Sequence, residues 1–182
     1  MGKRNKIIFR ISISSLCIAL GLVLPFLTGQ IPEVGNMLCP MHIPVLICGF
    51  ICGWKYGVIV GFIVPLLRSF IFGMPTLYPA AISMAFELAT YGLISGVLYL
   101  ILNKPNKNFY LSLYITLIIS MISGRIVWGL IRFILSLADN SLVFSFEMFM
   151  SGAFLTAWPG IILQLVLVPT IIITLKKANL IK

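Results

Sequence analysis

Four charged side chains lie inside long apolar stretches of this sequence, namely Arg68, Glu87, Arg125 and Arg132. If these stretches cross a membrane, a charged side chain that faces lipid costs about 2.5–3.5 kcal/mol near the bilayer centre. We therefore expect all four to face either the interior of a helix bundle or the membrane interface. Because three are positive and one is negative, they cannot all neutralise one another. The surplus positive charge is suited to binding an anion.

Two aromatic residues share helical faces with these charges. Trp128 lies between Arg125 and Arg132 at a spacing of i, i+3 and i+7, and Tyr91 follows Glu87 by one turn. This arrangement predicts an outward-opening pocket in which arginine binds an anionic group while an aromatic ring stacks on the rest of a small molecule. The alternative is structural: Glu87 pairs with one arginine to tie helices together, and another arginine extends to the lipid headgroups.

Two further residues are candidates for the same pocket because of their position in the chain. His42 is the single histidine and lies in the segment Pro40-Met41-His42-Ile43-Pro44, at the outer mouth of an apolar run. We expect this segment either to cap the pocket or to form a rigid loop with an interfacial histidine. Trp158 precedes Pro159, where we expect a bend that turns the indole towards the interior.

The sequence predicts neither an enzyme nor a metal site. It contains no phosphate-binding loop, no His-Glu-x-x-His and no Gly-x-Ser-x-Gly. One histidine and four acidic residues leave few groups for acid–base catalysis. Four cysteines are present, but no Cys-x-x-Cys pair and no second histidine accompany them. We expect no cofactor and no metal in this chain.

Composition and hydropathy predict an all-α integral membrane protein. Of the 182 residues, 60% are hydrophobic and 9% are charged, against roughly a quarter charged in a soluble domain. The mean hydropathy is +1.13. We expect a single domain over residues 1–182 with six transmembrane helices. Their expected positions are 7–28, 41–53, 57–73, 79–102, 109–138 and 146–175.

The charge distribution predicts the orientation of these spans. The net charge of +9 does not indicate nucleic-acid binding, because the basic residues form short clusters between apolar runs. With six spans, ten of the 13 basic residues lie in segments on one side, and three of the four acids lie in loops on the other. Since positive residues concentrate in the cytoplasm, both the N-terminus and the C-terminus are expected there.

Several short motifs together resemble those of a transporter family. They are Ser15 and Ala19 as a small-x-x-x-small pair, Pro40-Met41-His42-Ile43-Pro44, and the runs Gly49–Gly57 and Met84–Gly92. With six spans in about 180 residues, the chain resembles the substrate-binding S component of an energy-coupling factor (ECF) transporter. The resemblance covers nearly the whole chain.

The resemblance implies a function, partners and a location. Such components bind a vitamin or related micronutrient near the outer face of the bacterial plasma membrane, as multi-pass proteins. They assemble with a transmembrane scaffold subunit and two ATPase subunits, and those ATPases use the ATP. The scaffold usually contacts an Ala-x-x-x-Ala pair on the first span, which implies a contact at Ser15 and Ala19, with serine at the first position here.

The leading hypothesis is therefore a vitamin-uptake component. The surplus positive charge favours a substrate with a carboxylate or phosphate, such as pantothenate, over a neutral or cationic one such as thiamine. A ring-bearing vitamin such as riboflavin stays open through Trp128 and Tyr91. The alternative is a non-transporting membrane scaffold or accessory subunit whose buried charges bind a partner protein.

Overall fold

The computed structural model describes residues 3–28, 31–103, 108–139, 142 and 144–178, and within these ranges all regular secondary structure is helical. This confirms the predicted all-α class. The helices, together with the short helical turns η1, η2 and η3, are α1 (Lys3–Val23), η1 (Leu24–Thr28), α2 (Pro32–Leu38), α3 (His42–Cys52), α4 (Trp54–Phe72), η2 (Leu77–Ala81), α5 (Ile82–Leu102), α6 (Phe109–Ala138), α7 (Phe146–Met150), η3 (Ser151–Leu155) and α8 (Trp158–Lys177).

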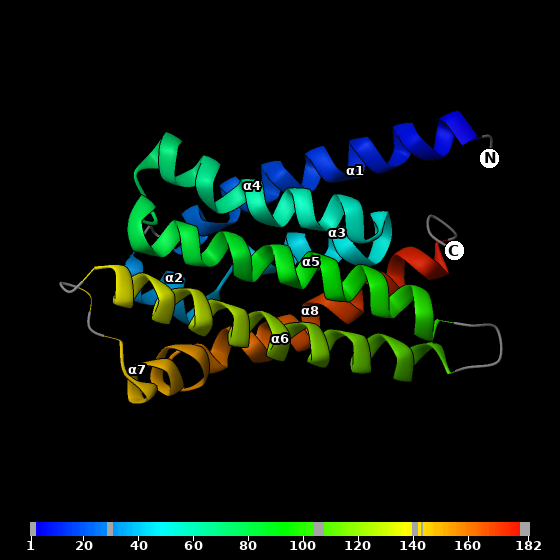
Figure 1. The fold of residues 1–182 in the computed structure, drawn as a ribbon. Helices are drawn as coiled ribbons and strands as arrows, with labels where there is room; N and C mark the ends of the chain where they lie inside the picture. The colour runs from blue at the N-terminus through cyan, green and yellow to red at the C-terminus, as the bar shows by residue number, and fades with distance from the viewer. Residues whose placement is uncertain (1–2, 29–30, 104–107, 140–141, 143, 179–182) are drawn as a thin grey trace.

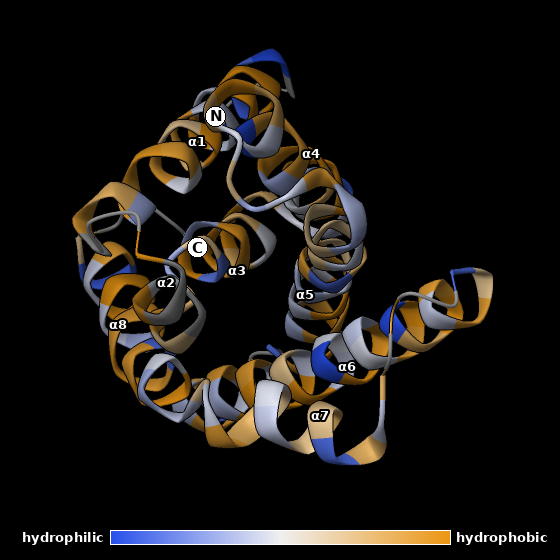
Figure 2. Cartoon of the chain, turned by 90° about the vertical axis from the view of Figure 1, so that its left-hand side faces the viewer, coloured by the Kyte–Doolittle hydropathy of each residue, from blue (hydrophilic) through white to orange (hydrophobic). Residues whose placement is uncertain are grey.

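Five helical segments of the described chain are long and apolar enough to cross a membrane. They run over Arg4–Leu27, Trp54–Phe72, Leu77–Leu102, Phe109–Ala138 and Trp158–Lys177. Two apolar helical segments, His42–Cys52 and Phe146–Leu155, are shorter. The bundle exposes many large aliphatic and aromatic side chains, and in Figure 2 the outer faces of the helices are largely hydrophobic. This is the surface of a protein that lies in lipid.

The predicted last span, 146–175, is not one helix. It consists of α7, η3 and then α8, which begins at Trp158. Pro159 occupies the first turn of α8, where its missing N–H leaves no hydrogen bond unmade. Where the sequence predicted a bend, the structure therefore has a break, and a new helix starts immediately before the proline.

The short helix α3 lies inside the bundle. Almost all of its side chains are buried, and it packs against α1, α4, α5 and α8. Figure 2 shows it within the ring that the other helices form. Gly53, with a φ of 89°, ends α3 and permits the sharp turn into α4. Where the sequence predicted separate apolar stretches over 41–53 and 57–73, α3 and α4 are separate helices, and α4 already starts at Trp54.

Small residues let α4 and α5 pack so closely that their backbones are in contact. A Cβ atom on Gly57 would lie 2.7 Å from the carbonyl oxygen of Gly92, and a Cβ on Gly92 would collide with the backbone of Gly57. A Cβ on Gly61 would likewise collide with the carbonyl of Leu88. Close approach through small residues is the usual way in which helices associate in lipid. This packing fixes the position of α5, which carries Glu87.

The ends of the bundle differ. In Figure 1, α1 begins and α8 ends at the same end, whereas α2, α7 and the connection between α4 and α5 lie at the other. We call the second end the loop end of the bundle. It contains the cavity described next.

Candidate functional site

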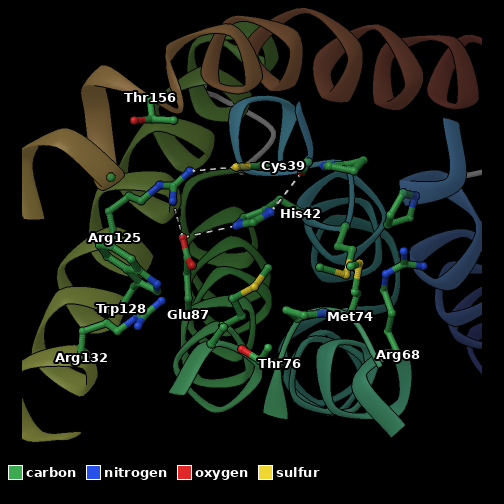
Figure 3. Close-up of a pocket in the computed structure, with 18 of the residues that line it drawn as sticks. Cys39, His42, Arg68, Met74, Thr76, Glu87, Arg125, Trp128, Arg132 and Thr156 are labelled. Atoms are coloured by element: carbon green, nitrogen blue, oxygen red, sulfur yellow. Dashed lines mark hydrogen bonds and ion pairs between the residues drawn. The ribbon is translucent and has the colours of Figure 1, made fainter. Parts of the chain in front are cut away.

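A cavity of about 450 Å³ lies at the loop end of the bundle. Its lining comes from η1, from α2 and its link to α3, from the first turn of α3, from α4 and its link to α5, and from α5, α6 and η3. Six of the eight residues predicted for a pocket line it, and Figure 3 shows them together: His42, Arg68, Glu87, Arg125, Trp128 and Arg132. The volume lies in the range of small-molecule sites.

Glu87 is the centre of a buried polar cluster. Its side chain is only 1% exposed, and it lies 3.1 Å from Nη1 of Arg125 and 3.3 Å from Nε2 of His42. The hydroxyl of Tyr91 donates a hydrogen bond to it at 3.2 Å. All three contacts are made to the same carboxylate oxygen, Oε1. The carboxylate thus joins groups from α3, α5 and α6.

Tyr91 does not line the cavity but lies behind Glu87, one turn further along α5. It is 1% exposed, and its ring fills the space beside Gly124 of α6, where any Cβ would collide with it. Its ring also lies 5.1 Å from the ring of His42. Tyr91 therefore supports the cluster from below rather than offering a surface on which a ligand can stack.

His42 is held between two acceptors at the start of α3. Its Nδ1 lies 3.1 Å from the carbonyl oxygen of Cys39, and its Nε2 lies at ion-pair distance from Oε1 of Glu87, without the alignment of a hydrogen bond. Both ring nitrogens face oxygen atoms, so His42 bridges the link before α3 and the carboxylate of Glu87.

Cys39 contacts Arg125, and the sequence analysis did not predict this contact. It ends α2 in a left-handed conformation, with a φ of 46°, and its Sγ accepts a hydrogen bond from Nη2 of Arg125 at 3.3 Å. Burial raises the pKa of this thiol, so the sulfur stays protonated at neutral pH. Arg125 therefore connects α6 both to Glu87 and to the link between α2 and α3.

Arg68 makes structural contacts that hold two helices together beside the cavity. Its Nη1 donates to the carbonyl oxygen of Leu22 at 2.6 Å. Its guanidinium lies 5.1 Å from the ring centre of Phe26 and 5.4 Å from that of Phe72. These contacts hold α4 against the end of α1.

Arg132 has a different environment from the other two arginines. Its guanidinium lies 5.6 Å from the ring centre of Trp128, which in turn stacks at 6.4 Å on Phe149 of α7. Among the described residues, no carboxylate lies within ion-pair distance of Arg132, and its buried Nε has no hydrogen-bond partner. The aromatic stack orients a positive charge that makes no ion pair within the described part of the protein.

The remaining predicted residues lie outside the cavity. Trp158 is 58% exposed at the start of α8, because the helix that begins there directs the indole away from the bundle. Ser15 and Ala19 lie on the exposed face of α1, opposite the buried Ser14 and Cys17. Exposed small residues on a membrane helix suit a close contact with another helix.

Part of the lining carried no signal in the sequence. Met74, Thr76 and Thr156 line the cavity. Such residues are common in any apolar helix or loop. Among the described residues, no group of three His, Cys, Asp or Glu side chains is arranged to hold a metal ion. Three arginines and one glutamate leave the lining with a positive surplus, which is suited to an organic anion.

Comparison with known proteins gives one match. The family model described as "ECF transporter, substrate-specific component" matches residues 9–172. No curated protein and no solved structure matches the sequence. The match covers nearly the whole chain, and the apolar helices agree with the multi-pass membrane proteins of that family. The chain therefore belongs to the family of substrate-specific components of ECF transporters.

Proposed function

We propose that this chain captures a small organic anion, such as pantothenate or another acidic vitamin, in the cavity at its loop end. The observation that carries the proposal is the charge of the lining, in which three arginines face one glutamate. Arg125 is largely neutralised by Glu87, but Arg132 has no acidic partner among the described residues. A bound anion would supply that partner, and desolvation inside the cavity would strengthen the contact.

In this proposal the chain binds substrate and performs no chemical step. ATP is used by two ATPase subunits of the ECF module, and a transmembrane scaffold subunit links them to this chain. The contact is proposed on α1, where Ser15 and Ala19 are exposed. Replacing Ala19 by leucine should weaken copurification with the scaffold while substrate binding by the isolated chain persists. Stable association with unrelated membrane proteins instead would favour a general accessory subunit.

The proposed topology has six passages, with both ends in the cytoplasm and the cavity open to the outside. Two observations support it: the start of α1 and the end of α8 lie at the same end of the bundle, and that end carries most of the basic residues that the structure describes. The second passage would combine α3 with the link that precedes it, because α3 alone is too short to cross a bilayer.

Binding by the purified protein tests the proposal. The chain in detergent would be heated with pantothenate, biotin, nicotinate, lipoate, riboflavin and thiamine in turn. A ligand at about 100 times its dissociation constant should stabilise the folded state by roughly 2.7 kcal/mol. We expect stabilisation by at least one acidic compound and none by thiamine. Stabilisation by thiamine alone, or by no compound, would argue against an anion-binding component.

A further inference from the structure

The two carboxylate oxygens of Glu87 have different surroundings. Oε1 receives Nη1 of Arg125, the hydroxyl of Tyr91 and the ion-pair contact of His42. For Oε2 the described residues provide no hydrogen-bond donor and no ion-pair partner. In Figure 3 the carboxylate lies between the arginines of α6 on one side and His42 on the other.

This second oxygen belongs to a side chain that lines the cavity. A carboxylate oxygen in a desolvated site is costly unless a donor reaches it, because burial removes its hydration. A ligand that displaces solvent from the cavity must therefore provide an N–H or O–H group for Oε2. A ligand without such a group would leave the oxygen unsatisfied and would bind less tightly.

Arg125 also fixes which oxygen of Glu87 is available to a ligand. The guanidinium of Arg125 has donors and no acceptor, so an oxygen must occupy the Oε1 position. The two oxygens of Glu87 therefore cannot exchange places: Oε1 contacts the protein, and Oε2 is left for the ligand. Oε2 is a fixed acceptor, and the guanidinium of Arg132, oriented by Trp128, is a fixed cation on the same cavity wall.

We propose that the substrate is an acid that also carries a hydrogen-bond donor, with the acid bound by Arg132 and its N–H or O–H group donating to Oε2 of Glu87. The inference rests on the proposed function and narrows its substrate class. It separates acids with a donor, such as pantothenate and biotin, from acids without one, such as nicotinate and lipoate.

Binding constants of the wild-type protein for those four acids provide the first test. A charge-assisted hydrogen bond predicts that the best donor-bearing acid binds roughly tenfold or more tightly than either acid without a donor. If nicotinate or lipoate binds as tightly as pantothenate and biotin, the donor requirement is wrong while the anion-binding function stands. If none of the four acids binds, both proposals are overturned.

The variant Glu87→Gln gives a second test, in which the preference for donor-bearing acids should decrease. Because Arg125 can only donate, the amide must keep its oxygen in the Oε1 position and place its NH₂ group in the Oε2 position. An acceptor for the ligand is thereby replaced by a donor. We expect the preference for donor-bearing acids over donorless acids to fall by roughly tenfold or more, while binding of the donorless acids is retained.

Glu147→Gln is the matched control, since Glu147 is an exposed carboxylate on α7 outside the cavity lining. It should keep the wild-type preference. An unaltered preference in Glu87→Gln would overturn the assignment of Oε2. Should that variant fail to fold, the wild-type comparison of the four acids decides the question alone.

Discussion

At the scale of single residues, Glu87 is a buried carboxylate that three groups from three helices share. Its partner Arg125 is 6% exposed and also contacts Cys39. A buried ion pair adds little stability in itself, but loss of one partner leaves the other charge buried without compensation. The cluster therefore makes the cavity wall sensitive to single substitutions.

Glu87→Ala should destabilise the protein by about 3–5 kcal/mol, because Arg125 would keep its charge in a desolvated site. Thermal unfolding of the purified protein in detergent measures this change. The double variant Glu87→Leu with Arg125→Met removes both charges and should regain much of the stability. A single variant that unfolds at the wild-type temperature would show that the charge on Arg125 is compensated in another way.

Arg132→Gln should have the opposite profile, with a large effect on binding and a small one on stability. Arg132 has no carboxylate partner among the described residues, so its loss exposes no buried charge. We expect affinity for an acidic ligand to fall roughly ten- to a hundredfold, measured by titration calorimetry. Arg4→Gln, at an exposed arginine of α1, is the control. Equal affinities for both variants would place the anion elsewhere.

The sequence located most of the polar lining because a charge inside an apolar helix must face the interior. It could not show that Arg125 contacts Cys39, since this depends on a left-handed residue at the end of α2. It also placed Trp158 in the interior, although that indole is exposed. Helical spacing identifies a shared face only where the helix is continuous, and a new helix starts at Trp158.

At the scale of helices, hydropathy located the boundaries of four long spans within a few residues. It could not divide 146–175 into α7, η3 and α8, because all three pieces are apolar. It also could not show that α2 packs against α8, where Gly160 approaches the carbonyl oxygens of Met37 and Leu38. Hydropathy reports composition, whereas these features depend on contacts between distant segments.

Gly92→Leu should disrupt the packing of α4 on α5. A side chain at this position meets the backbone of Gly57, which cannot move without displacing α4. We expect a loss of folded protein after membrane extraction, measured by size-exclusion chromatography, and weaker ligand binding because α5 carries Glu87. Ala138→Leu, a similar but slightly smaller enlargement at an exposed position of α6, should leave the elution profile unaltered. A normal profile for Gly92→Leu would contradict the close packing.

At the scale of the whole molecule, the fold separates a basic end from an end that holds the cavity. If the cavity opens outwards, a cysteine placed at Phe146, which is 75% exposed at the loop end, should react with a membrane-impermeant maleimide in intact cells. A cysteine at Lys177, at the end of α8, should react only after the membrane is opened. Since Cys17, Cys39, Cys48 and Cys52 are buried, they give little background labelling. The reverse pattern would invert the topology.

Because α3 lies inside the bundle, the geometry of the cavity does not depend directly on the thickness of the surrounding bilayer. Its 11 residues extend about 16 Å, far less than a hydrocarbon core, yet its neighbours shield it from lipid. When the membrane is thinner or thicker, the long outer helices should therefore adjust by tilting. The hydrophobic mismatch then affects only the helices at the outside of the bundle. His42, at the first turn of α3, should keep its distance from Glu87 in bilayers of different acyl-chain length, so ligand affinity should vary little with lipid composition.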